Sequence, residues 1–163
     1  DFPDIPIPTF DEFYASDGSG YEAYFFTGEK PLSGRGFIIR DGENPVGFIS
    51  YCNFHLTQGI SELDIWLSCE ANCGKGYGTD ALVSLGDYLH EKMDINTLII
   101  APSGKNTRAI RAYEKVGFQR TDLPMSAFLR SEYISLYGEG DYGADGTVIL
   151  VKKFESQVSA SCC

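Results

Sequence analysis

The alternation of hydrophobic and polar positions predicts a hairpin in the first half of the chain. Residues 36–40 and 45–52 are rich in branched and aromatic side chains, and they flank the polar cluster 41–44. A polar cluster between two such runs is typical of a turn that joins two strands. We therefore expect two antiparallel strands here.

The run 60–68 predicts a third strand with two different faces. Its side chains alternate, and one set is mainly apolar while the other carries acidic groups. The set expected to face the core is Ser61, Leu63, Ile65 and Leu67. The opposite face carries Glu62, Asp64 and Trp66. This second face is a candidate lining of a functional site.

The pattern becomes helical at a glycine-rich run, residues 74–79. Apolar residues recur at helical spacing through 76–93, which predicts an amphipathic helix. The short apolar run 96–101 is typical of a buried strand, and the residues 102–104 end it before a second helix. Strand, helix, strand and helix in this order form a crossover unit.

The second helix has one apolar face and a clear end. That face carries Ala109, Ile110, Tyr113 and Val116. Gly117 stands where a left-handed residue ends a helix, and Phe118 is expected to open the next strand. The segment 137–146 predicts turns, and 147–154 predicts the last strand.

The two ends of the chain have weaker patterns. Thr9 and Glu12 have the spacing of a capping box, which predicts a short helix at 9–15. The remainder of 1–34 has no clear period, and because the chain starts at Asp1 we expect this N-terminal part to be incomplete. Residues 156–163 have the composition of a frayed tail.

Composition predicts one domain, residues 1–163. The chain has 163 residues, of which 43% are hydrophobic and 13% aromatic, and this is enough for one sizeable core. No apolar run approaches the roughly 20 residues that cross a bilayer. No basic segment followed by an apolar one opens the chain. We therefore expect a cytoplasmic protein with no membrane partner.

Charge and cysteine usage narrow the set of partners. The formal charge of −10 disfavours binding to nucleic acid. The negative charge either keeps the protein soluble or, in addition, attracts a cationic amine as substrate. An anionic cofactor would then need a local site such as a helix N-terminus. The five cysteines include no CxxC pair, and the chain has only two histidines, so we expect reduced thiols and no metal site.

The glycine-rich run 74–79 has the features of a phosphate-binding turn. Glycines permit a tight path and a close approach of phosphate, and the following helix directs its first N–H groups at the ligand. The run lacks the Lys-Ser/Thr pair of a Walker A loop and the spacing of a dinucleotide fingerprint. The alternative is a plain strand-to-helix turn.

Together with a second motif, this run resembles the GCN5-related N-acetyltransferase (GNAT) family. The second motif is Asn106, Ala109, Tyr113 and Gly117-Phe118, which is similar to the family's N, A and Y before GF. The resemblance is clearest over 36–121. Within it, 66–79 and 108–118 look most like aminoglycoside 6'-N-acetyltransferases. It implies an α/β (α+β) fold with a mixed, mostly antiparallel central sheet that is flanked by helices and splits near the cofactor.

The resemblance also implies acetyl-CoA as the acyl donor and assigns residues to it. The pantetheine arm would pair with the strand at Ile65 and Leu67, and Asn106 would contact it or simply cap the helix. Cys73 stands where the family usually has glutamine or arginine, and Lys75 would compensate. The residues expected at the cofactor are Ile65, Leu67, Gly74, Lys75, Gly76, Tyr77, Gly78, Thr79, Asn106 and Ala109.

Three residues are candidates for catalysis. Tyr113 resembles the family's general acid, which would protonate the departing thiolate, although an aromatic residue at helical spacing is often simply core. Asp64 is the first candidate to accept the ammonium proton and Glu62 the second, although both also suit a solvated strand face. An acidic, aromatic rim for the acceptor is expected from Tyr133, Tyr137, Glu139, Asp141 and Tyr142.

The sequence thus predicts an N-acetyltransferase that acts on a primary amine of a small cationic acceptor, aminoglycoside-like or polyamine-like, by direct attack. The alternatives are acetylation of a protein N-terminus or lysine, and a non-catalytic acyl-CoA sensor. A ping-pong route through Cys69 or Cys73 ranks low, because no histidine lies near them in sequence. The oligomeric state stays open, with a homodimer as one option.

Overall fold

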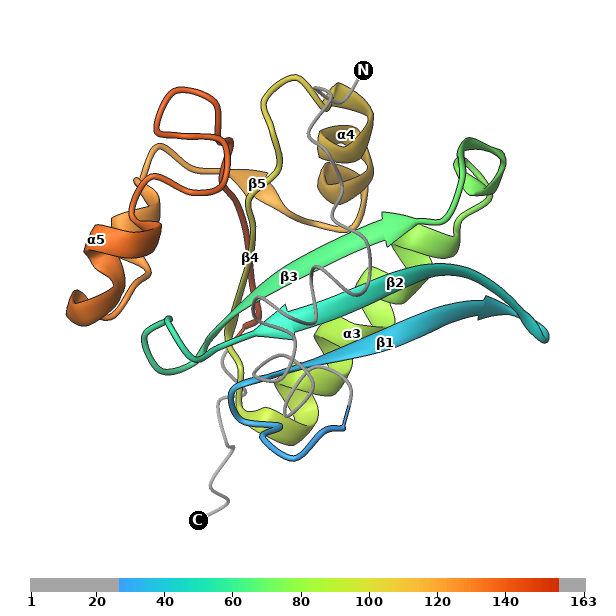
Figure 1. Ribbon diagram of the computed structural model, residues 1–163, viewed down its shortest axis with the longest axis horizontal. Helices are drawn as coiled ribbons and strands as arrows, with labels where there is room; N and C mark the ends of the chain where they lie inside the picture. Colours follow the sequence, from blue (N-terminus) through green and yellow to red (C-terminus); the bar gives the residue numbers. More distant parts are fainter. Residues whose placement is uncertain (1–26, 156–163) are drawn as a thin grey trace, which may run out of the picture.

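A computed structural model describes residues 27–155, which form a mixed sheet flanked by helices (Figure 1). The strand order within these residues is β1-β2-β3-β4-β6-β5. Only β3 and β4 run parallel among the paired strands, so the sheet is mostly antiparallel, as the sequence predicts. The strands are β1 (Gly34–Asp41), β2 (Asn44–Cys52), β3 (Ile60–Leu67), β4 (Thr97–Ile100), β5 (Gln119–Arg120) and β6 (Leu150–Lys153). The helix expected at 9–15 and the tail 156–163 lie outside the described residues.

The expected hairpin and the two faces of the third strand are confirmed. β1 and β2 pair around a turn in which Asp41 lies opposite Asn44. On β3, Ser61 and Leu63 are buried, whereas Asp64 and Trp66 are exposed. The register of β2 with β3 aligns Phe48 with Trp66, Ser50 with Asp64 and Cys52 with Glu62. The acidic face of β3 therefore continues across β2.

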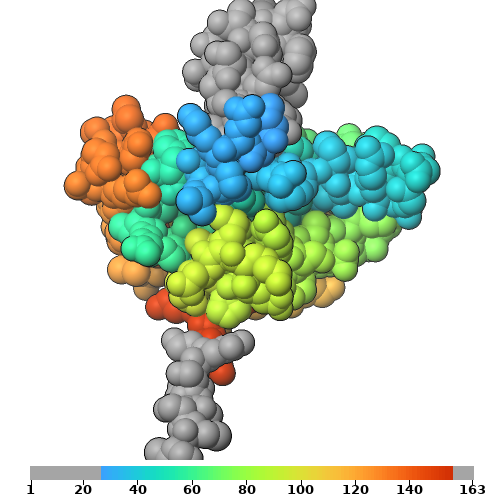
Figure 2. All heavy atoms as spheres, turned by 90° about the horizontal axis from the view of Figure 1, so that it is seen from below, coloured from blue at the N-terminus to red at the C-terminus, as the bar shows by residue number. Residues whose placement is uncertain are grey.

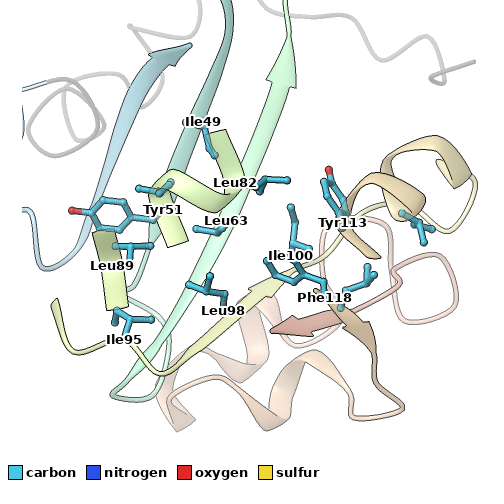
Figure 3. Packing of buried hydrophobic residues seen from close by; sticks show 13 residues of the cluster. Ile49, Tyr51, Leu63, Leu82, Leu89, Ile95, Leu98, Ile100, Tyr113 and Phe118 are labelled. Atoms are coloured by element: carbon cyan, nitrogen blue, oxygen red, sulfur yellow. The ribbon is translucent and has the colours of Figure 1, made fainter. Parts of the chain in front are cut away.

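The longer helices also form where the hydrophobic period predicts them. α3 spans Tyr77–Met93 and buries Leu82, Leu85 and Leu89. These side chains join Leu63, Leu98 and other apolar residues in the main core (Figure 3). α4 spans Thr107–Lys115 and adds Ile110 and Tyr113 to the same core. The layer of helices therefore covers the apolar face of the strands.

The end of α4 is fixed by a Schellman motif. Gly117 has φ of 95°, a left-handed conformation that glycine adopts without steric cost. Its N–H donates to the Glu114 carbonyl, and the Phe118 N–H donates to the Tyr113 carbonyl. Phe118 is consequently buried beside the helix, and β5 begins one residue later than expected, at Gln119.

The region after β5 differs from the sequence expectation. It contains short helical turns that no hydrophobic period indicated: η4 (Met125–Ala127), η5 (Ser131–Tyr133) and α5 (Ile134–Tyr137). β6 is shorter than the expected 147–154, and Thr147 instead forms an isolated bridge with Ser103. These turns cover the second face of the sheet with a core of Leu56, Ile99, Met125, Phe128, Leu129 and Ile149.

The space-filling view shows how these parts are distributed (Figure 2). In this view the orange segment around α5 and the cyan turn of the β1–β2 hairpin lie at opposite ends of the described part of the chain. α3, in yellow-green, lies beside β1 between these two ends. None of the helices within residues 27–155 combines the length and the apolar character that crossing a membrane requires.

Candidate active site

β3 and β4 pair only where β3 begins. The parallel register runs from Ile60 opposite Thr97 to Glu62 opposite Ile99. β4 then ends at Ile100, whereas β3 continues to Leu67. Figure 1 shows the two strands running apart beyond this point, with α4 on the far side of the opening. The second half of β3 therefore has no strand neighbour on this edge among the described residues.

The hydrogen-bond pattern shows which backbone groups this free edge presents. The Ser68 N–H donates to the Val46 carbonyl at 2.9 Å. In an antiparallel pair, such hydrogen-bonded residues alternate with residues whose N–H and C=O point the other way. The backbone groups of Ile65 and Leu67 must then face away from β2, toward the opening. The two residues that the sequence assigned to pantetheine are thus the ones whose backbone groups lack a strand partner among the described residues.

The glycine-rich turn leads from β3 into α3 and leaves space above its backbone. Gly74 and Gly76 have φ of 75° and 92°, and a Cβ atom added to either would meet nothing within 4 Å. α3 starts directly afterwards, so its first N–H groups have no partner within the helix. Gly78 lies against β3, since a Cβ there would be 3.7 Å from Ile65 Cδ1. The turn, the helix start and the strand edge therefore adjoin one another.

Two side chains of this turn, Tyr77 and Thr79, hydrogen-bond within the protein, so only the backbone of these residues is available to bind an anion. The Tyr77 hydroxyl donates to Asp41 Oδ2 at 2.5 Å, which ties α3 to the hairpin and raises the pKa of Tyr77. The Thr79 hydroxyl donates to the Gly76 carbonyl at 2.8 Å. Lys75 is exposed. An anion at this helix start would meet mainly backbone N–H groups.

The start of α4 lies on the other side of the opening. Asn106 caps this helix, because its side chain accepts from the Ala109 N–H at 3.2 Å. The capping role considered for Asn106 is therefore confirmed, while a contact with a cofactor stays a prediction. Arg108 forms an ion pair with Glu70 in η3 (Glu70–Asn72), which joins the two sides of the opening. No local sequence pattern indicates this pair, because the two residues are 38 positions apart.

Tyr113 reaches the opening from within the core. Its side chain is 8% exposed and packs with Phe118, at 6.4 Å between ring centroids. Figure 3 shows its hydroxyl directed away from Phe118. Burial raises the pKa of the Tyr113 phenol well above its usual range, and the Asp64 charge and Tyr142 raise it further. Tyr113 is therefore both a core residue and a neutral phenol close to the acidic face.

Asp64 carries a carboxylate in an unfavourable environment. Its side chain is exposed to solvent, yet the surrounding protein removes enough water to raise its pKa. The negative charges of Asp141 and Glu62 raise the pKa further, whereas the Ile65 N–H lowers it. A cation placed between these carboxylates would relieve their repulsion.

Glu62 is paired with a histidine that the sequence analysis did not single out. His55 Nε2 lies 2.8 Å from Glu62 Oε2, and His55 is 5% exposed. Cys52, the register partner of Glu62, is a free thiol whose pKa is raised to about 12 by burial and by the Glu62 charge. A thiol in that state is a poor nucleophile at neutral pH.

The expected acidic and aromatic rim is only partly assembled. Asp141 and Tyr142 lie close to Asp64: the Asp141 charge raises the pKa of Asp64, and the Asp64 charge raises the pKa of Tyr142. Tyr133 and Tyr137 instead pack edge-on against Phe54, with centroids 5.5 and 6.0 Å away. The segment that carries these residues has no periodic pattern, so its placement could not be derived from sequence.

The described histidines and cysteines form no other reactive pair. His90 contacts the Ile95 carbonyl at 2.9 Å and stacks on Phe154, and Cys73 Sγ lies 3.9 Å from the Cys69 carbonyl oxygen. Residues 27–155 contain no group of three or more His, Cys, Asp and Glu side chains arranged to hold a metal ion.

Comparison with known proteins adds a family and several relatives. The model of the acetyltransferase (GNAT) domain family matches residues 10–119. Over 62 residues the chain is 37% identical to aminoglycoside N(6')-acetyltransferase type 1 of Klebsiella pneumoniae. This aligned segment is 38% of this chain and 31% of that protein. It is also 37% identical over 62 residues to the kanamycin resistance protein of Rhizobium radiobacter, which is 57% of that protein. The matched segment is thus about a third to just over half of these relatives.

Solved structures show the same fold at low identity. Aminoglycoside acetyltransferase AAC(6')-Ib, in complex with coenzyme A and kanamycin, superimposes with a TM-score of 0.59 at 22% identity, over 81% of this chain and 73% of that one. A point mutant of spermidine N-acetyltransferase SpeG from Vibrio cholerae gives a TM-score of 0.61 at 18% identity, over 89% of this chain and 75% of that one.

The state of Asp64 leads to a prediction about stability. Its folded pKa is raised, so folding favours the protonated form, and that stabilisation is lost as pH rises through the folded pKa. At pH 7, above the unfolded pKa, the carboxyl therefore opposes folding. We expect Asp64→Asn to raise the melting temperature at pH 7 and to leave it unchanged near about pH 3, where the carboxyl is neutral in both states. Thermal unfolding at both pH values checks this, and a lower melting temperature at pH 7 would contradict it.

Proposed function

Because this chain belongs to the GNAT acetyltransferase family, we propose that it transfers an acetyl group from acetyl-CoA to a primary amine by direct attack. The observation that carries the proposal is the free edge of β3, which has a glycine-rich helix start at one end. Tyr113 and Asp64 lie within charge-interaction range of each other beside that edge. The proposed donor site and the proposed proton-transfer site thus adjoin one another.

The residues around the opening fit the donor. The pyrophosphate would be held by backbone N–H groups at Gly74, Lys75, Gly76, Tyr77, Gly78 and Thr79. Gly74 and Gly76 have a positive φ that glycine adopts without steric cost, and the space above them is open to a ligand. The pantetheine amides would pair with the outward-facing backbone groups of Ile65 and Leu67, beside Asn106 and Ala109. When bound, acetyl-CoA supplies an activated acetyl group as a thioester.

The acidic face supplies proton acceptors. An amine attacks only as the free base, so the acceptor must first lose a proton from its ammonium group. Asp64 and Glu62 lie on one face of β3 and can accept that proton, directly or through water. The same carboxylates, with Asp141, would also attract a cation. This is why we propose a small cationic amine rather than an uncharged acceptor.

Tyr113 would then stabilise the departing thiolate. Its raised pKa keeps the phenol protonated at neutral pH, so it can donate a hydrogen bond as negative charge develops. A free thiol has a pKa of roughly 8.5, below that of this phenol, so complete transfer of the phenol proton to the thiolate is uphill and Tyr113 acts by donating a hydrogen bond. Burial of the ring fixes the donor in position.

The relatives support this class of acceptor. They include proteins named for acetylation of aminoglycosides and of spermidine, and both are polycationic amines. We propose an aminoglycoside-like or polyamine-like acceptor for this chain. Cys52, Cys69 and Cys73 are all free thiols, which fits a reducing compartment such as the cytoplasm.

A thiol-release assay tests the proposal. Acetyl-CoA is supplied with aminoglycosides, polyamines or basic peptides, and a thiol-reactive dye records free coenzyme A. We expect turnover with at least one small polycation and much slower turnover with peptides. Preference for a peptide would favour protein acetylation instead. Cofactor binding without turnover on any amine would favour the sensor.

The role of Tyr113 predicts a specific kinetic change. Tyr113→Phe keeps the buried ring and removes the hydroxyl, so kcat should fall by about 10²-fold while the affinity for acetyl-CoA changes little. Steady-state kinetics and calorimetry measure the two quantities. An unchanged kcat would remove Tyr113 from this role.

The glycine-rich turn 74–79 predicts a second effect, on binding alone. Gly76→Val should weaken acetyl-CoA binding, because the new side chain would fill the space above the turn and oppose the φ of 92°. Gly59→Val is the matched control, since Gly59 has φ of 80° and equally open space but lies before β3. Both variants carry similar backbone strain. Calorimetry that shows equal affinity of the two variants for acetyl-CoA would contradict the proposed role of this turn.

A further inference from the structure

His55 occupies a turn between β2 and β3, and its one polar side-chain contact within residues 27–155 is with Glu62. The distance from Nε2 to Glu62 Oε2 is 2.8 Å. His55 Nδ1 is buried and has no hydrogen-bond partner among the described residues. A carboxylate only accepts hydrogen bonds, so the proton belongs on Nε2, and a second proton on Nδ1 would be a buried donor without a partner. The contact with Glu62 thus makes Nε2 the donor of this pair.

The surroundings hold this ring in one orientation. It packs against Phe54 and Tyr137, with ring centroids 4.8 and 5.3 Å away. The backbone carbonyl of His55 accepts from the Arg130 N–H at 2.9 Å, and Arg130 Nε donates to the Leu56 carbonyl at 2.8 Å. The turn is therefore fastened to the segment before η5 on one side and to α5 on the other.

This contact leaves Glu62 with one oxygen engaged and one available. Oε2 accepts from His55, and no described residue hydrogen-bonds to Oε1. The Glu62 side chain is 23% exposed, so Oε1 remains within reach of water or a ligand. Asp64 lies two residues further along the same face and has no side-chain partner of this kind among the described residues. Of the two carboxylates, only Glu62 is oriented by a buried donor.

We propose that His55 is a positioning residue for acetyl transfer and that Glu62 is the carboxylate it positions. Glu62 Oε1 takes one proton from the ammonium group of the acceptor, and the freed electron pair on nitrogen attacks the thioester carbonyl and forms the C–N bond. The C–S bond then breaks, so that coenzyme A departs as a thiolate that accepts a hydrogen bond from Tyr113, and the second proton on nitrogen passes to solvent. The proton then passes from Glu62 to solvent, while the Oε2 contact with His55 persists throughout. Asp64 and Asp141 hold the cationic acceptor near Glu62. The proposal rests on the proposed function.

A set of variants tests it with the amine that gives turnover. His55→Phe keeps an aromatic ring against Phe54 and Tyr137 but removes the Nε2 donor, so kcat should fall on the order of 10²-fold with little change in KM for acetyl-CoA. His55→Gln can still donate a hydrogen bond to Glu62 and should recover most of that loss. His90→Gln is the matched control, because His90 stacks on Phe154 away from this face, and its kcat should stay unchanged.

A double-mutant cycle gives the decisive comparison. Because His55 acts through Glu62, the double variant His55→Phe/Glu62→Gln should be no slower than Glu62→Gln alone. Thermal unfolding checks that each variant folds. If His55→Phe does not fold, His55→Asn replaces it, since its shorter side chain cannot span the contact.

The outcomes separate this proposal from the one it rests on. Additive losses in the cycle, or a kcat of His55→Phe equal to that of the wild type, would overturn the role of His55 while the transferase activity stands. Absence of turnover by the wild type on every amine would overturn both. A loss in His55→Phe that His55→Gln does not recover would indicate a merely structural role and would also overturn the proposal.

Discussion

The separation of β3 from β4 is the constraint on which the rest of this site depends. The strands share three registered pairs, and β4 then ends before Pro102, which has no N–H to continue a ladder. β3 extends five residues further, to Leu67, with one edge unpaired among the described residues. An unpaired edge normally invites association with another strand. Here the free edge of β3 lies between the N-terminal ends of α3 and α4. The unpaired backbone groups of the strand are therefore close to the first N–H groups of the helices, which have no partner within the helix.

Charge is arranged to suit two ligands of opposite sign. The chain carries a formal charge of −10, which would repel an anionic cofactor, yet the cofactor residues we propose act through backbone N–H groups and a helix dipole. The acidic residues Glu62 and Asp64 lie on the opposite face of β3 from Leu63 and the core. The alternation of a strand thus gives one element two electrostatic surfaces. Repulsion between Asp64 and Asp141 opposes folding, and a bound cation would relieve it.

The sequence predicted those parts that rest on local periodicity or on short-range hydrogen bonds. The two faces of β3, the amphipathic α3, the cap at Asn106 and the left-handed Gly117 were all predicted correctly. Each of them depends on residues within a few positions of one another. The resemblance to a family then supplied the chemistry that spacing alone could not.

The features that the sequence did not reveal depend on contacts between distant segments. Glu70 and Arg108 are 38 residues apart, and Arg130 contacts Leu56 across 74 residues. The short helices η4, η5 and α5 have too few turns to show a hydrophobic period. His55 lies in a turn, where no period applies, so only the fold shows that its ring meets Glu62. A histidine followed seven residues later by a strand glutamate was the one available signal, and it is weak.

Amide hydrogen exchange at β3, measured with and without coenzyme A, tests the central claim most directly. The amides of Ile65 and Leu67 should exchange quickly in the free protein and slow markedly when coenzyme A is bound. The amides of Asp64 and Trp66 face β2 and should be protected in both states. Unchanged exchange at Ile65 and Leu67 upon saturation with coenzyme A would contradict the claim that the free edge of β3 holds the cofactor.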